Sequence, residues 1–595
     1  MNKKTVALAV WIAAVLLTVG GSMGHGVQEQ APKPVTLADC PNCTDFNPSL
    51  EGCTVIMVGK NASTDGSVMT THTCDCGLCD WTFRRIPARD HQPGEMRRIF
   101  YSDQFGTWPP DLGLKWDRVP LDGFSGLEIP EIPHTYGYIL GAFGYMNDKQ
   151  VSIGESTIGN VEKMENNTPA PKFDITMLTL AAMERGGTAR EAIQVMGSLA
   201  EKYGYGHTDS GEMLAVADPN EVWMFEVFPA GALWTPASGK PGAVWCAQRV
   251  PDDHVAVCPN ESRIGEIDLD NKDYFMASPN VVSFAVDQKL YDPKSGKPFN
   301  WKRAYSPNDL SAASTHGSRV RLWRFFNLVA PSLNLGPETN NMDFPFSVKP
   351  EKKMSVQDVM NMTRDKCEGT IFDPARGLQG GPFANPNFIP YGFKLDGKTY
   401  NTPRIIDVNR AEYVTVTQAR SGMPDPIGGI VWMAYGAQDT SCYMPLYNGI
   451  TEIPRGFEIG DHWAFSREAT RWAFDYVDYH TQVVYSYAIQ DVRAAQKKYE
   501  VPVVERTPLI DKNALELYQK DPAAAIRYLT DYCLNNAAAV TDAWWKLGDS
   551  LLVKYNKLWI YDVKARKRNP LVFPDWYLRE LVESNKLTPQ KSAEH

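Results

Sequence analysis

The chain has 595 residues, of which 43% are hydrophobic, 11% aromatic and 22% charged. This apolar content is enough for a large buried core and excludes a disordered or low-complexity protein. The formal net charge is -10 and no run of basic residues occurs, which excludes a nucleic-acid-binding protein.

The first 24 residues have the order of a secretory signal peptide. Asn2, Lys3 and Lys4 precede an apolar stretch over residues 6–19, and small residues follow it. The stretch is shorter than the ~20 residues of a membrane-spanning helix, although it is also compatible with an uncleaved anchor. We predict an exported protein, periplasmic or secreted, without stable membrane insertion once the signal is removed. Residues 25–52 are rich in Pro and polar residues and are predicted to be a propeptide or linker.

Strand patterns begin abruptly at Cys53. Residues 53–60 (CTVIMVGK) and 67–73 (SVMTTHT) flank the turn 61–66 (NASTDG), which predicts a hairpin. Two further hairpins are predicted, one joining residues 212–217 to 222–227 and one joining residues 243–249 to 254–258.

Helical patterns occur in blocks between and after these strands. A helix is predicted at residues 174–185, and Thr188 with Glu191 forms a capping box that opens the next helix. Residues 461–595 are mostly helical, over 463–498 and 513–555, and aromatics such as Trp472, Phe474 and Tyr479 are interpreted as a buried helix face. Such blocks favour an α+β fold with antiparallel sheets in residues 53–460, followed by a helical C-terminal extension.

Cys53 has two interpretations. A cysteine at the start of a buried strand is ordinarily a small hydrophobic residue. However, Gly52 offers an unhindered carbonyl to the neighbouring thiol, the segment upstream looks dispensable, and the sheet begins at the cysteine itself. If the Gly52–Cys53 bond is cut, Cys53 gains an α-amine with an unperturbed pKa of about 7.7 to 8.0. One residue then supplies both nucleophile and base.

Several segments resemble one known family in the family's own order. CTVIMVGKNASTDGSVM with THTCD, GAFGYMNDKQVSIGEST (141–157), GEMLAVADPNEVWMFEV (211–227) and RVPDDHVAVCPNESRIGEID (249–268) are similar to segments of the N-terminal-cysteine dipeptidases of the dipeptidase A and secernin type. That family belongs to the Ntn-hydrolase superfamily, with penicillin V acylase and bile-salt hydrolase as relatives. The resemblance covers residues 53–490 and implies a four-layer αββα sandwich.

The resemblance also implies roles for single residues. Cys53 matches the processed nucleophile, and Gly52–Cys53 the processing site. Related hydrolases carry Arg-x-x-Asp on the second strand; here Asp75 fits the aspartate that holds the α-amine, but His72 replaces the arginine. We expect His72 to supply a donor or a cation whose titration makes activity pH-sensitive.

The resemblance implies roles for three further residues. Asn147 and Asn260 match oxyanion-hole donors, although an asparagine beside a strand end is more often a turn residue. Arg319 matches a distal arginine, with Arg321 and Arg324 as competitors and a solvated helix face as the plainer alternative.

A cluster of cysteines departs from the family pattern. Two C-x-x-C pairs, Cys40/Cys43 and Cys76/Cys79, together with Cys74, are compatible with a zinc site or with disulfides. Export favours disulfides. We hypothesise that Cys40 or Cys43 is bridged to the 74–76–79 group, which would keep the propeptide attached after cleavage.

We therefore expect an exported cysteine peptidase that hydrolyses dipeptides or short peptides through Cys53 and a thioester and requires no metal or organic cofactor. The resemblance also implies a homo-oligomer. One alternative is an acyl-amide hydrolase of the penicillin acylase or bile-salt hydrolase type. A second alternative is a non-catalytic exported protein that binds zinc or makes redox contacts.

Overall fold

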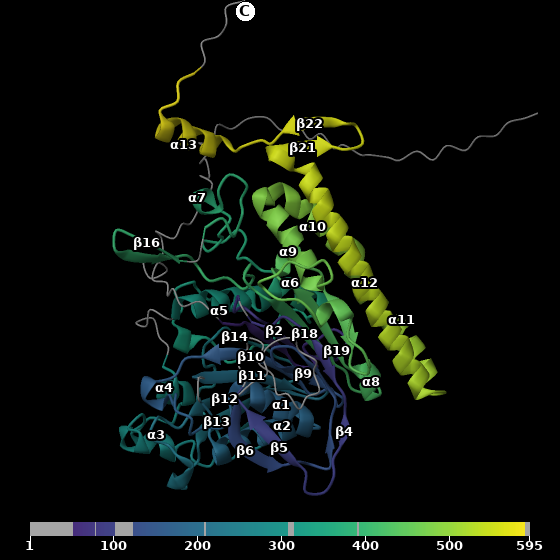
Figure 1. Ribbon diagram of the computed structural model, residues 1–595. Coiled ribbons are helices and arrows are strands. Elements are labelled where there is room, and N and C mark those ends of the chain that lie inside the picture. The colour runs from purple at the N-terminus through teal and green to yellow at the C-terminus, as the bar shows by residue number, and fades with distance from the viewer. Residues whose placement is uncertain are drawn as a thin grey trace, which may run out of the picture.

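The computed structural model describes residues 52–77, 79–101, 123–206, 210–307, 315–389 and 392–589. The predicted signal peptide, almost all of the predicted propeptide, and Cys40 with Cys43 lie outside these residues. Two large antiparallel sheets with helices packed on them form the described body, which confirms the α+β class (Figure 1).

The smaller of the two sheets has six strands and contains the predicted hairpin that begins at Cys53. Residue pairs such as Met57–Thr70 join β1 to β2, which confirms the hairpin. In spatial order the strands are β14 (Val255–Cys258), β1 (Val55–Val58), β2 (Val68–Thr73), β18 (Tyr413–Ala419), β19 (Ile430–Tyr435) and β20 (Met444–Tyr447).

The larger sheet has eight strands and contains the second predicted hairpin, β11 with β12, which is confirmed. In spatial order its strands are β15 (Phe275–Ala277), β13 (Ala243–Val250), β12 (Val222–Pro229), β11 (Gly211–Ala217), β10 (Ser152–Ile158), β9 (Gly144–Asn147), β8 (Tyr138–Leu140) and β3 (Arg84–Ile86).

The two sheets approach each other closely where β10 crosses β2. A Cβ atom added at Gly154 would lie 2.2 Å from the backbone oxygen of Thr71, so only glycine permits this approach. An apolar core between the sheets packs Val55 and Met57 together with Met213 and Met224. The side chains of Val55 and Met57, in the strand that follows Cys53, are therefore fixed between the two sheets.

The third predicted hairpin is wrong. Residues 243–250 form β13 in the eight-stranded sheet, whereas Val255–Cys258 form β14, which pairs with β1 in the other sheet. The turn between them carries the chain from one sheet to the other: the Asp252 carbonyl accepts a hydrogen bond from the Asn61 amide at 2.7 Å. The local turn signal was correct, but it does not specify which strands pair.

Helices pack on both sheets. α1 (Ile175–Arg185) and α2 (Ala189–Tyr203) contact the eight-stranded sheet, and α5 (Thr315–Val329) and α6 (Val356–Thr363) contact the six-stranded sheet. The side chain of Asp174 caps α1, and that of Thr188 caps α2. Glu191 bonds the Gly187 amide at 2.8 Å, so it closes the cap one residue upstream of the predicted box.

Four long helices of the C-terminal segment pack against the body, with boundaries that differ from the predicted 463–498 and 513–555. They are α9 (Thr470–Val483), α10 (Tyr485–Tyr499), α11 (Val501–Tyr518) and α12 (Pro522–Lys554). α9 packs on β19 and α12 on β20, and α11 runs beside α12 (Figure 1). Phe474 is buried as expected, whereas Tyr479 is 70% exposed.

Shorter elements complete the description. Beyond α12 the chain forms β21 (Trp559–Asp562), β22 (Lys567–Pro570) and α13 (Asp575–Asn585), at the end of α12 away from the sheets (Figure 1). The rest are β4 (Arg89–Asp90), β5 (Met96–Phe100), β6 (Phe124–Pro130), β7 (His134–Thr135), β16 (Gly392–Leu395), β17 (Lys398–Asn401), α3 (Ser283–Asp287), α4 (Trp301–Tyr305), α7 (Gly377–Gly380) and α8 (Asp425–Gly428). Among the described helices, none combines the length and apolarity needed to cross a membrane.

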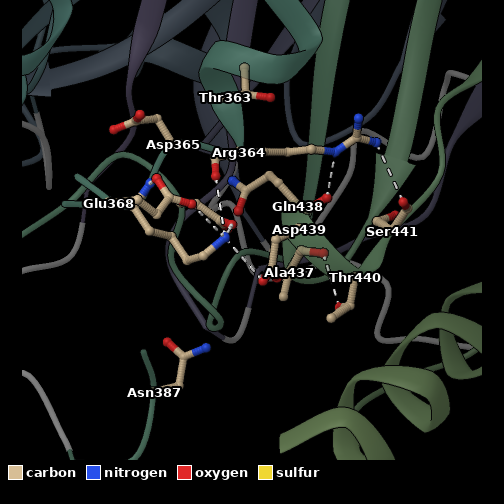
Figure 2. Close-up of polar contacts among 12 residues, drawn as sticks. Thr363, Arg364, Asp365, Glu368, Asn387, Ala437, Gln438, Asp439, Thr440 and Ser441 are labelled. Atoms are coloured by element: carbon tan, nitrogen blue, oxygen red, sulfur yellow. Dashed lines mark hydrogen bonds and ion pairs between the residues drawn. The ribbon is translucent and has the colours of Figure 1, made fainter. Parts of the chain in front are cut away.

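Ion pairs of Lys366 join the segment after α6 to the loop that precedes β18. The Lys366 ammonium lies 3.2 Å from Asp439, 3.5 Å from Glu368 and 3.6 Å from Asp407; Glu368 and Asp439 are drawn in Figure 2. The neighbouring Arg364 bonds the backbone oxygens of Gln438 and Ser441 (Figure 2). Removing one partner of such a cluster leaves an uncompensated buried charge, so the arrangement fixes the loop around Asp407.

Candidate active site

Cys53 lies two residues before β1, in the space between the two sheets. Its side chain is a free thiol and 5% exposed. Gly52 precedes it with φ +142, a conformation that favours glycine. A Cβ atom at Gly52 would lie 2.3 Å from Nδ2 of Asn260, so the close packing also requires glycine here.

Two potential proton acceptors lie beside the thiol. His72 Nε2 is 4.0 Å from Cys53 Sγ, and ligand atoms of Cys53, His72 and Glu155 all lie within 4.8 Å of one another. Burial, with Glu155 and Asp75 nearby, raises the pKa of Cys53 well above its usual value. The thiol is therefore protonated at neutral pH and needs a base before it can attack.

His72 is oriented by β10. Its Nδ1 lies 3.0 Å from the Glu155 backbone oxygen and 3.2 Å from the Glu155 backbone nitrogen. Nε2 faces the sulfur as an acceptor when Nδ1 donates to that oxygen, and as a donor when Nδ1 accepts from that amide. Burial lowers the pKa of His72 to about 3, so the ring is neutral near pH 7. The expected cation at this position is thus absent near neutral pH, and so low a pKa makes the ring a poor proton acceptor. Burial raises the pKa of the neighbouring Glu155, so its carboxylate is the better base for the thiol.

Two guanidinium groups contact the carbonyls on either side of the Gly52–Cys53 junction. Arg404 Nη2 donates to the Gly52 oxygen at 2.8 Å and to Asp75 Oδ2 at 2.5 Å. Arg321 Nη1 donates to the Cys53 oxygen at 3.1 Å and to Thr54 Oγ1 at 2.9 Å. The backbone around the junction is therefore held by fixed positive charges.

Asp75 lies close to the nucleophile, as the motif implies. Its Oδ2 accepts from Thr73 Oγ1 at 2.9 Å in addition to Arg404. Burial raises the pKa of Asp75, while Arg404, Arg410 and Thr73 oppose that rise. The backbone amide of Asp75 bonds the Cys53 sulfur and lowers its pKa, which supplies part of the thiolate stabilisation that the absent arginine would give.

Asn260 is also brought to the junction. It follows β14 with φ 61, and its Nδ2 donates to the Thr157 oxygen at 2.9 Å. Its Oδ1 accepts from Arg321 Nη2 at 2.9 Å, and its backbone amide bonds Ser156 Oγ at 3.1 Å. Ser156 Oγ in turn donates to the Cys53 oxygen at 3.2 Å, so Asn260 is linked to the nucleophile through Ser156 and Arg321.

Asn147 is placed elsewhere. It ends β9, and its Nδ2 donates to the backbone oxygens of Met183 and Gly186, at 2.9 and 2.7 Å. Its Oδ1 accepts from the amides of Lys149 and Val151, so the side chain closes a turn. Along β10 at about 3.3 Å per residue, this turn lies on the order of 15 Å from Ser156.

Arg319 is buried on α5, so the alternative of a solvated helix face is wrong. It is Arg321, two residues further along the same helix, whose guanidinium reaches Cys53. Arg324 instead pairs with Asp365 at 2.6 Å. Arg321 therefore fits the predicted role of the distal arginine best.

The described part of the cysteine cluster contains one disulfide, between Cys76 and Cys79. Cys74 is a buried free thiol. The predicted bridge from Cys40 or Cys43 falls outside the described residues and stays a prediction.

The most important residues missed by the sequence analysis are Arg404 and Glu155. Arg404 is 1% exposed and comes from a loop distant in sequence from every quoted motif. Glu155 lies in the segment 141–157, which resembles the family, but no pattern in that segment marks it as a site residue. Thiolate, imidazole and carboxylate are zinc ligands as well, but a nucleophile with acid–base partners also accounts for the arginines on the two carbonyls.

Comparison with known proteins identifies the family. The profile of peptidase family C69 matches residues 52–498, beginning at the glycine before Cys53. The chain is 27% identical over 419 residues to a probable dipeptidase of Salmonella dublin, covering 69% of this chain and 83% of that protein. It is 24% identical over 416 residues to dipeptidase A of Lactobacillus helveticus, covering 68% and 77%. A dipeptidase of Bifidobacterium longum is 25% identical over 433 residues, covering 68% and 73%. The resemblance is thereby confirmed, and the chain is an enzyme that belongs to peptidase family C69.

Proposed function

We propose that the protein is an exported dipeptidase that cuts its own chain between Gly52 and Cys53 and uses the new N-terminal cysteine as its nucleophile. The observation that carries the proposal is the junction itself: a thiol beside an imidazole and a carboxylate, with one guanidinium on each flanking carbonyl. The names of the relatives support dipeptides as substrates.

The architecture supports an N-terminal-nucleophile fold. Two stacked antiparallel sheets, with helices packed on each, correspond to the layers of an αββα sandwich. The nucleophile then stands at the start of a central strand, where two sheets hold it rigidly and loops shape the pocket.

In the mature enzyme the α-amine of Cys53 takes the thiol proton, and the sulfur attacks the scissile carbonyl of the substrate. The leaving amine receives that proton, and water hydrolyses the thioester. Asp75 holds the α-amine in this proposal: its backbone amide bonds the Cys53 sulfur, and its buried Oδ1 has no hydrogen-bond partner among the described residues. Asn260 is the oxyanion donor in this proposal because Ser156 and Arg321 link it to Cys53, and its Nδ2 exchanges the Thr157 oxygen for the oxyanion. Asn147 lies in the turn that follows β9, away from the junction.

Export is supported by the order of residues 1–24 and by the disulfide Cys76–Cys79, because disulfides persist in oxidising compartments.

A substrate panel tests the proposed function. Purified full-length protein is assayed with L-dipeptides, tripeptides, penicillin V and a conjugated bile acid, beside a Cys53→Ala variant. We expect hydrolysis of dipeptides by the wild type and none by the variant. Hydrolysis of acyl amides alone would favour an amidase, and dipeptide hydrolysis by the variant would exclude Cys53 as the nucleophile. Metal analysis of the same preparation tests the zinc-binding alternative.

A further inference from the structure

The Gly52 carbonyl is the group that must be attacked if the chain cuts itself, and its oxygen has a charged partner. Arg404 Nη2 donates to this oxygen at 2.8 Å. During attack by the Cys53 sulfur, the carbonyl oxygen gains negative charge. A cationic donor already in place at that oxygen stabilises this charge more than it stabilises the neutral carbonyl.

Arg404 is held in position by contacts that do not depend on the reaction. Nη2 also bonds Asp75 at 2.5 Å, and Nη1 bonds the backbone oxygen of the neighbouring Ile405. The side chain is 1% exposed, so water screens its charge little.

The loop that carries Arg404 is anchored three residues further on. The Asp407 amide donates to the Asp365 oxygen at 3.1 Å, and its carboxylate lies 3.6 Å from the Lys366 ammonium. Glu368 and Asp439 approach the same ammonium (Figure 2). This buried cluster fixes the backbone that presents Arg404, so the guanidinium needs little reorganisation when charge develops.

We propose that Arg404 is a catalytic residue of self-cleavage, donating to the oxyanion that forms on the Gly52 oxygen. The inference rests on the proposed function, because it concerns the reaction that generates the N-terminal nucleophile. It also assigns the positive charge that the sequence motif lacks at His72 to a residue from a distant loop.

The reaction proceeds in two steps. The Cys53 thiol gives its proton to the Glu155 carboxylate beside it, and the sulfur bonds to the Gly52 carbonyl carbon while Arg404 holds the resulting oxyanion. Collapse breaks the bond between that carbon and the Cys53 nitrogen, which receives the proton from Glu155 and becomes the free amine. Water then hydrolyses the thioester, leaving a Gly52 carboxylate and restoring the Cys53 thiol.

The test follows self-cleavage of the full-length chain by pulse-chase and intact mass, in wild type, Arg404→Gln and Arg404→Lys. Loss of one preorganised oxyanion donor typically costs about a hundred- to a thousand-fold in rate, which is the slowing expected for Arg404→Gln. Arg404→Lys keeps the charge on a less rigid donor, so an intermediate rate is expected. Arg97→Gln is the matched control: Arg97 on β5 is also a buried arginine and bonds the Glu184 carboxylate at 3.0 Å, and we expect a rate close to that of the wild type.

Hydroxylamine separates a catalytic role from other roles. It cleaves thioesters, so it restores the cleavage rate of a variant that is slow only in the second step. We expect no restoration for Arg404→Gln, because the first step is the slow one. Restoration by hydroxylamine, a wild-type rate in Arg404→Gln, or equal slowing in Arg97→Gln would each overturn the inference.

Folding and the proposed function are controlled separately. Near-ultraviolet circular dichroism and melting temperature show whether Arg404→Gln is folded. If it is not folded, the self-cleavage rate of Arg404→Lys, which keeps the ion pair with Asp75, is compared with that of the wild type. A wild-type chain that is never cut at Gly52–Cys53 would refute the proposed function itself, whereas a cut wild type with an equally fast Arg404→Lys and Arg404→Gln refutes only the role of Arg404.

Discussion

Gly52→Ala is expected to slow self-cleavage by about ten- to a hundred-fold. Gly52 has φ +142, where a side chain strains the backbone by about 1–3 kcal/mol. The added Cβ would also lie 2.3, 2.6 and 2.7 Å from Nδ2, Cγ and Oδ1 of Asn260. Because Thr157 and Arg321 hold that side chain, residue 52 is the group that moves, and its carbonyl leaves Arg404. Each 1.36 kcal/mol of lost transition-state stabilisation is tenfold in rate.

The assay is the fraction of cleaved chain against time, measured by intact mass after synchronised expression. Gly66→Ala is the control: Gly66 has φ +80 in the β1–β2 turn, and open space surrounds its Cβ position. We expect that variant to lose about 1 kcal/mol of stability and to cleave at the wild-type rate. A Gly52→Ala chain that cleaves as fast as the wild type would refute the argument that this backbone geometry prepares the bond for attack.

Three further outcomes are expected. His72 has a folded-state pKa of about 3 against an unfolded value of about 6.5, so its contribution to stability is present above pH 6.5 and is lost as the pH falls. In urea titrations, His72→Gln should therefore make the fall in unfolding free energy between pH 6.5 and 4.5 shallower by roughly 2 kcal/mol. An unchanged slope would contradict the buried neutral ring. Asn260→Ala should lower kcat about a hundredfold or more with an unchanged fold. Asn147→Ala should instead cost about 1–3 kcal/mol of stability and leave kcat nearly unchanged. The reverse pattern in kinetics and melting would identify Asn147 as the oxyanion donor. A small fragment should leave the mature protein on gels only after reduction; release without reductant would exclude a bridge from Cys40 or Cys43 to the cluster that follows β2.

The sequence was most informative where neighbouring residues determine the structure. The β1–β2 hairpin, the β11–β12 hairpin and the cap at Thr188 depend on local turn and capping chemistry, and all were predictable. The pairing of β14 with β1 was not, because a turn signal specifies a reversal of the chain and not the sheet that each strand joins.

The same distinction applies to the site. Cys53 and Asp75 follow from one motif on one hairpin, and the structure brings them together. Arg404 contacts Gly52 across a sequence separation of 352 residues, and a single arginine in a loop carries no local signal of that contact. Asn147 was misleading for the opposite reason: its motif matched, but its side chain satisfies the backbone groups of its own turn.

The most direct measurement is the N-terminal residue of the protein in a preparation that hydrolyses dipeptides, determined by Edman degradation together with intact mass. The account predicts a chain that begins at Cys53. An active preparation in which the peptide bond after Gly52 is still intact would contradict it, because the thiol and the α-amine would not then belong to one terminal residue.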